Sequence, residues 1–163
     1  MIRGLHHASI TTPNRDRLVA FYRDQLGFAV VRESSWSGGA ATADAIFGLA
    51  DSAVKMTMLR TANAFLEIFE FDHPAGRPGD PDRPVCDAGV THVCLCVTDI
   101  HAEHARLSAA GMRFHCPPQP ATGVGWATYG RDPDGNIVEL IEPEADGPFA
   151  FPPSGQGVAS PVK

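Results

Sequence analysis

The chain has 163 residues, 44% of them apolar, which is enough for a hydrophobic core of about one domain. Its 13 Lys and Arg are outnumbered by 19 Asp and Glu, and the formal net charge is −6. Nucleic-acid binding depends on phosphate neutralisation by clustered Lys and Arg, so we exclude a nucleic-acid partner. No apolar run approaches the roughly 18 residues of a membrane span, and no signal peptide is apparent. We therefore expect a cytoplasmic protein with no membrane partner.

The four cysteines also bear on the expected location of the protein. Cys86, Cys94, Cys96 and Cys116 form no C-x-x-C pair, and Cys94 and Cys96 lie in an apolar, strand-like run. Such a pattern favours reduced thiols that are buried as small apolar side chains over a disulfide or a metal-binding cluster.

Proline and glycine divide the chain into two organised parts. Residues 72–89 hold four Pro and three Gly, through which neither a helix nor a central strand can run, so this segment is predicted to be a linker. Residues 143–163 are rich in Pro and Gly and poor in apolar residues, which indicates a flexible tail or an arm that embraces a partner subunit. The organised parts are 1–71 and 90–142.

In chain order, the first part predicts one strand, one helix and three strands. A strand-like run at 5–10 is followed by Thr12 and Pro13, a helix start, and by apolar residues at helical spacing up to a stop at Gly27. Strand patterns then follow. They lie at 28–32, 54–59 and 65–71, and residues 33–51 form an insertion rich in Gly, Ala and Ser.

The second part repeats this order. A strand-like run at 90–97 precedes Asp99, a good helix N-cap, and the helix stops at Gly111. The strands that follow are 112–115, 126–131 and 136–142. The sequence Asp-Pro-Asp-Gly-Asn at 132–136 predicts a tight turn in which Gly135 takes a positive φ. Each part therefore predicts a β-α-β-β-β module, and the chain as a whole two tandem modules of the α+β class.

Four polar residues fall at matching places on the first and last strands of the two modules. Alternate side chains of a strand point to opposite faces, and the apolar neighbours of these four residues would pack against the helix. The four polar side chains are thus expected to point away from the helices. They are His7 and Glu67 in the first module and His92 and Glu139 in the second.

Each of these residues alone could be a hydrogen-bonded core histidine or a solvated strand glutamate. A buried, unpaired His or Glu costs several kcal/mol, however, and a duplicated set is better explained as one site. Two imidazoles and two carboxylates suit one divalent ion such as Zn²⁺, Ni²⁺, Co²⁺, Mn²⁺ or Fe²⁺. His6 is a rival to His7, but it falls on the helix-facing side of its strand and does not match His92.

Aromatic residues near this set are candidates for substrate binding. Phe65 and Phe69 share the strand face of Glu67, and Trp126 is the candidate from the second module. Trp36 and Tyr129 could join the same cup, although aromatic residues on strands also serve as ordinary core.

Several stretches resemble the vicinal oxygen chelate superfamily, which includes glyoxalase I, methylmalonyl-CoA epimerase, extradiol dioxygenases and the fosfomycin and bleomycin resistance proteins. They lie at 7–10, 18–28, 65–69, 92–95 and 132–140. The resemblance implies that each module curls into a concave mixed sheet around a metal site. By the same resemblance His7, Glu67, His92 and Glu139 are the ligands, and the two halves of the site come from one chain or from two subunits.

The ligand set resembles that of bacterial glyoxalase I. This implies a metal-dependent lyase or isomerase that binds a small molecule through vicinal oxygens and moves a proton through an enolate or enediolate, with Glu67 and Glu139 as catalytic residues. Alternatives within the superfamily are an Fe²⁺ extradiol dioxygenase, which uses two His and one carboxylate, an epimerase-like enzyme, and a non-catalytic resistance protein. Exposed sheet edges and the Pro-rich tail predict a homodimer.

Overall fold

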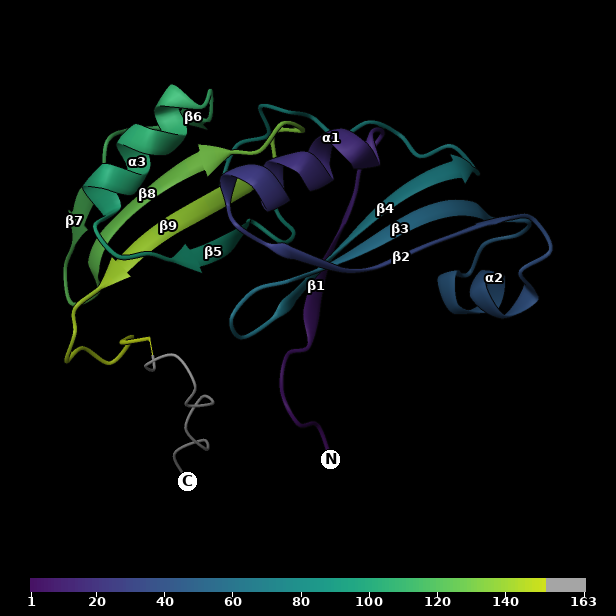
Figure 1. The fold of residues 1–163 in the computed structure, drawn as a ribbon, viewed down its shortest axis with the longest axis horizontal. Helices are drawn as coiled ribbons and strands as arrows, with labels where there is room; N and C mark the ends of the chain where they lie inside the picture. The colour runs from purple at the N-terminus through teal and green to yellow at the C-terminus, as the bar shows by residue number, and fades with distance from the viewer. Residues whose placement is uncertain (152–163) are drawn as a thin grey trace. The chain divides into compact units, whose positions relative to one another are not determined.

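The computed structural model describes residues 1–151, so the part of the predicted tail at 152–163 lies outside the described residues (Figure 1). The chain divides into two compact units, Met1–Asp80 and Pro81–Lys163. Each unit has its own sheet and its own core. Within residues 1–151, every helix is too short or too polar to cross a membrane.

The first unit is a four-stranded mixed sheet with one main helix. Its strands lie in the order β1-β4-β3-β2; β1 and β4 are parallel and the other pairs antiparallel. The elements in chain order are β1 (His7–Thr11), α1 (Arg15–Ala20) with its π-helical continuation η1 (Phe21–Gln25), β2 (Ala29–Ser37), α2 (Ala41–Phe47), β3 (Ala53–Arg60) and β4 (Phe65–His73).

The second unit repeats this topology. The order is β5-β9-β8-β6, with β7 also paired to β8, and β5 runs parallel to β9 as β1 does to β4. Its elements are β5 (His92–Cys96), α3 (Ile100–Ala109), β6 (Arg113–Phe114), β7 (Gln119–Ala121), β8 (Gly125–Arg131) and β9 (Ile137–Pro143). The predicted α+β fold with two β-α-β-β-β modules is thereby confirmed.

Each core lies between the helix and one face of its sheet. In the first unit Leu18 and Tyr22 are fully buried, as are Leu59 and Ile68 of the sheet; in the second, the fully buried side chains are Ile100, Leu107, Val138 and Leu140. These strand residues alternate with the predicted site residues, so the site residues lie on the opposite, open face of each sheet.

The helix boundaries follow local capping. Asn14, rather than Thr12, caps α1, because its side chain accepts a hydrogen bond from the Arg17 N–H. Asp99 caps α3 as predicted and accepts from the Ala102 N–H. Gly27 and Gly111 follow the helices with φ of 74° and 95°, which confirms them as the stops.

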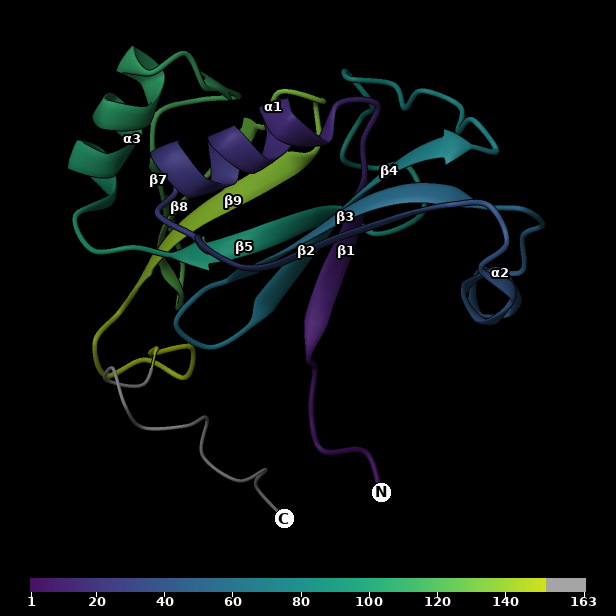
Figure 2. The same cartoon turned by 45° about the vertical axis from the view of Figure 1, so that its right-hand side comes forward.

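The insertion predicted at 33–51 is shorter than expected, because β2 continues to Ser37 along the sheet edge. The rest contains α2, which lies beyond the ends of β2 and β3 in both views (Figures 1 and 2). Phe47 attaches this helix to the sheet: its ring stacks on Trp36 with the centroids 5.9 Å apart and meets Phe69 edge-on at 5.5 Å.

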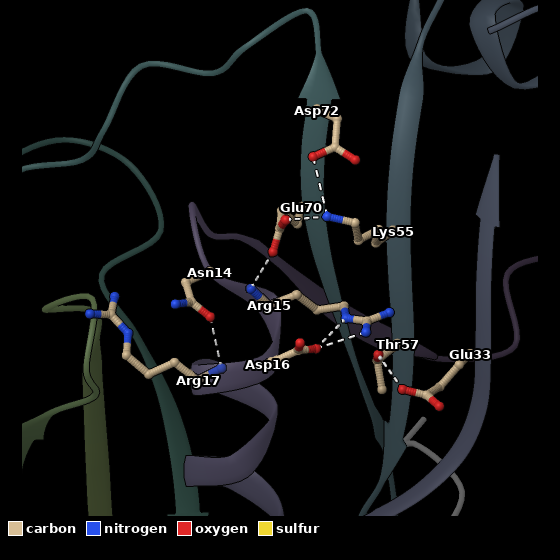
Figure 3. A network of polar contacts seen from close by, with 9 residues as sticks. All are labelled: Asn14, Arg15, Asp16, Arg17, Glu33, Lys55, Thr57, Glu70 and Asp72. Carbon is tan, nitrogen blue, oxygen red and sulfur yellow. Dashed lines mark hydrogen bonds and ion pairs between the residues drawn. The ribbon is translucent and has the colours of Figure 1, made fainter. Parts of the chain in front are cut away.

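A second glutamate on each last strand fixes the start of the helix above it. Glu70 of β4 accepts hydrogen bonds from the Arg15 N–H at 2.7 Å and from Lys55 Nζ at 2.7 Å (Figure 3). Glu142 of β9 accepts from the N–H groups of Asp99 and Ile100. Both carboxylates therefore satisfy helix N-terminal N–H groups, which have no partner within the helix.

Glu70→Gln is expected to lower the free energy of unfolding by about 1 kcal/mol at pH 7, because it removes the charge from both hydrogen bonds. Lys55, and then the Arg15 N–H, hold the pKa of Glu70 below its ordinary value of 4.5. The contribution is therefore complete above pH 4.5 and is lost as the pH falls through the lowered pKa. Urea unfolding of both proteins between pH 3 and 7 measures this; a difference that does not shrink in acid contradicts it.

Candidate functional site

The first module brings two predicted site residues together on its open face. His7 of β1 and Glu67 of β4 place Nε2 and Oε2 3.4 Å apart, and their side chains are 38% and 15% exposed. Strands β1 and β4 pair in parallel, and Ser9 lies opposite Glu67. His7 therefore lies two residues before the residue that pairs with Glu67. The pair is half-open to solvent and close enough for both groups to contact one ligand.

The second module reproduces this pair at the same register. His92 of β5 and Glu139 of β9 place Nε2 and Oε2 2.9 Å apart, with side-chain exposures of 29% and 15%. Cys94 lies opposite Glu139, as Ser9 does opposite Glu67. The Nδ1 atom of His92 is buried and lacks a hydrogen-bond partner among the described residues.

The distances in both pairs are compatible with a shared metal ion. Two donor atoms that each lie about 2.1 Å from a divalent cation are about 3.0 Å apart at a right angle and about 3.4 Å apart at the tetrahedral angle. The separations of 2.9 and 3.4 Å fall at these values. Within residues 1–151, no three or more His, Cys, Asp or Glu side chains gather closely enough to hold an ion, so each module supplies two of the four predicted ligands.

The predicted aromatic residues occupy different places. Phe65 stacks on His6 with the ring centroids 4.9 Å apart, and His6 in turn contacts His7 through their Nδ1 atoms at 2.9 Å. Phe69 lies on the Glu67 face and joins the aromatic cluster around Phe47. Phe65 therefore lies next to the first His–Glu pair, and Phe69 lies on the same face of the sheet as that pair.

Trp126 is not brought together with the others. It pairs with Glu142 across β8 and β9, on the helix side of the sheet, and its ring meets that of His101 of α3 at 4.9 Å. Glu139 has Tyr129 as its cross-strand neighbour instead. The open face of the second module thus carries Tyr129 as its aromatic residue.

Tyr129 was only a secondary candidate for the aromatic cup in the sequence analysis, behind Phe65, Phe69 and Trp126. Its ring lies 5.0 Å from that of His92 and 6.2 Å from that of His115. Burial, and then the nearby Glu139 carboxylate, raise the pKa of the phenol above its ordinary value. The signal that could have identified it is strand parity: Tyr129 and Trp126 are three residues apart on one strand and so face opposite ways.

The prediction of buried cysteines is wrong. All four cysteines are free and exposed. Cys94 and Cys96 share the parity of His92, so they lie on the open face and not in the core. Partial loss of hydration, with a further contribution from Glu139, raises the pKa of the Cys94 thiol to about 12. The thiol is therefore protonated near neutral pH.

Comparison with known proteins gives this arrangement a family. The model of the Glyoxalase/Bleomycin resistance protein/Dioxygenase superfamily matches residues 4–140. The uncharacterized protein YaeR of Escherichia coli is 26% identical over 141 residues, which cover 86% of this chain and 97% of YaeR.

Solved structures share the fold. A glyoxalase family protein from Bacillus cereus has a TM-score of 0.79 at 20% identity, and the match covers 88% of this chain and 95% of that one. The fosfomycin resistance protein FosX from Listeria monocytogenes, in a structure with Mn(II) and 1S,2S-dihydroxypropylphosphonic acid, has a TM-score of 0.59 at 18% identity, with coverage of 88% and 93%.

Proposed function

The chain belongs to the Glyoxalase/Bleomycin resistance protein/Dioxygenase superfamily, and from that premise we propose that it is a divalent-metal-dependent lyase or isomerase of the glyoxalase type. Its substrate in this proposal is a small molecule with two vicinal oxygens. The observation that carries the proposal is the duplication of one His–Glu pair at the same register in both sheets.

In this proposal His7, Glu67, His92 and Glu139 hold one divalent ion of the series Zn²⁺, Ni²⁺, Co²⁺, Mn²⁺ and Fe²⁺. Support comes from the donor separations within each pair and from FosX, whose structure contains Mn(II) and a compound with two neighbouring hydroxyl groups. The second carboxylate favours proton transfer over ring-cleaving oxygenation, which needs two His and one carboxylate. A homodimer and a cytoplasmic location are parts of the same proposal.

A bound divalent cation supplies Lewis-acid polarisation of the substrate oxygens. We assign the proton transfer to residues of the chain. Glu67 or Glu139 would remove the proton from the hydroxyl-bearing carbon next to the carbonyl and return it to the carbonyl carbon, while the hydroxyl proton passes to the former carbonyl oxygen, so the isomerisation is balanced without a further reactant. Each carboxylate is only 15% exposed, which keeps much of the bulk water away from the proton in transit.

Metal analysis of the purified protein tests this proposal. We expect about one divalent ion per chain in the wild type and a loss of nearly all of it in the His7→Ala/Glu139→Ala double variant, which removes one ligand from each pair. The matched control is Glu70→Gln/Glu142→Gln, which changes two glutamates on the other face of the same strands and should retain the metal. Equal metal in the wild type and the ligand variant would reject the proposal.

A further inference from the structure

Two arginines lie on the same face of the first sheet as His7 and Glu67. Arg32 of β2 is paired with Met58 of β3, and Met58 is paired with Glu67 of β4. Residues paired across neighbouring strands share a face, so Glu67, Met58 and Arg32 form one row across the open face. Arg60 lies two residues beyond Met58 on β3 and points to the same side.

These two arginines differ from the other cationic side chains on the described strands. Neither Arg32 nor Arg60 has a hydrogen-bond acceptor or an ion-pair partner within residues 1–151, and both are exposed. The others are all engaged: Lys55 binds Glu70 and Asp72, Arg113 binds Asp82, and Arg131 binds three backbone carbonyls. The chain has a net charge of −6, yet both strand arginines without a partner among the described residues, Arg32 and Arg60, lie on the face of the first His–Glu pair.

The spacing of the two arginines suits one shared anion. Residues in this diagonal relation across adjacent strands lie about 7–8 Å apart, which is within the reach of two long side chains. Arg32 stands two strand spacings, about 10 Å, from Glu67, with the apolar Met58 between them. A guanidinium binds a carboxylate or phosphate through two parallel hydrogen bonds.

We propose that Arg32 and Arg60 form an oxyanion subsite for the substrate. The substrate is then a small organic acid or phosphate ester, with a short apolar stretch over Met58 between its vicinal oxygens and its anionic group. The inference rests on the proposed function, because it takes the His–Glu pairs as the place where the vicinal oxygens bind.

Three hydroxamates test this subsite by calorimetry on the protein loaded with Mn²⁺. Acetohydroxamate chelates a metal through two oxygens and has no further charge, succinic monohydroxamate adds a carboxylate, and phosphonoacetohydroxamate adds a phosphonate. We expect at least one anionic probe to bind about tenfold more tightly than acetohydroxamate, and its identity to distinguish a carboxylate from a phosphate substrate. Arg32→Gln and Arg60→Gln should each remove about fivefold of that advantage and leave acetohydroxamate unaffected. Arg77→Gln, outside the sheet, is the matched control.

A second titration separates failure of the subsite from failure of the proposed function. Metal-free protein is titrated with succinate and with inorganic phosphate at constant ionic strength, and the arginine Nε–H signals are followed by NMR. Selective shifts of Arg32 and Arg60 support the subsite even if no hydroxamate binds. Failure of all three hydroxamates to bind would reject only the metal site. The subsite is rejected if these signals do not shift. Where the hydroxamates do bind, it is also rejected if the anionic ones bind no more tightly than acetohydroxamate, or if the arginine variants weaken all three probes equally.

Discussion

Glu67→Gln and Glu139→Gln are each expected to slow proton transfer by a factor of about 10² to 10⁴. Glutamine keeps the size of the side chain and can still accept a hydrogen bond, but it cannot take a proton near neutral pH. Because the substrate is unidentified, the reaction class is measured directly: the protein is incubated with hydroxyacetone in deuterated buffer, and deuterium incorporation at the carbon next to the carbonyl is followed by NMR.

The structure provides matched controls for this experiment. Glu70 and Glu142 stand three residues beyond the site glutamates on the same strands, but they face the helices and bind N–H groups there. Glu70→Gln and Glu142→Gln should lower stability and leave the exchange rate unchanged. If all four variants exchange deuterium at the same rate, neither Glu67 nor Glu139 is the base.

Metal content measured on the same variants separates the two roles that we assign to these carboxylates. A variant that retains the metal and loses exchange identifies the base, whereas a variant that loses both identifies a residue needed chiefly as a ligand. Exchange that proceeds at the wild-type rate without metal would contradict the proposed mechanism.

The sequence predicted the fold and the His–Glu pairs because both depend on periods that the backbone fixes. A strand alternates its faces at every residue, so the apolar Leu66 and Ile68 were enough to place Glu67 on the open side. The repeat supplied the second argument, since His92 and Glu139 occupy the register of His7 and Glu67. Within each module the chain brings the His close to its Glu.

The features that the sequence did not predict depend on contacts between elements. The edge strand β2 continues through the polar run after Arg32. This run has no hydrophobic alternation, and it forms a strand because it pairs with β3 along one edge. The choice of Asn14 over Thr12 as helix cap is a local competition between two good capping residues. The helix-capping roles of Glu70 and Glu142 required knowledge of which helix end lies above each strand.

Gly135→Ala is expected to lower the free energy of unfolding by roughly 3 kcal/mol or more. Gly135 has a φ of +88°, a conformation that costs alanine about 1–2 kcal/mol. A Cβ atom at this position would also lie 2.2 Å from the carbonyl oxygen of Pro81 and 2.3 Å from its Cα, and backbone atoms cannot move aside without a wider shift. Urea unfolding, followed by circular dichroism, measures the loss.

The clash would also disturb the anchor of the segment that leads into the second unit. Arg131 donates hydrogen bonds to the carbonyls of Pro81, Arg83 and Gly135, and displacement of Pro81 breaks this shared contact. Gly123→Ala is the matched control, since Gly123 has a φ of +72° and no atom lies within 4 Å of an added Cβ. The control isolates the cost of the backbone conformation, about 1–2 kcal/mol. Equal losses in the two variants would show that Pro81 does not pack against the turn.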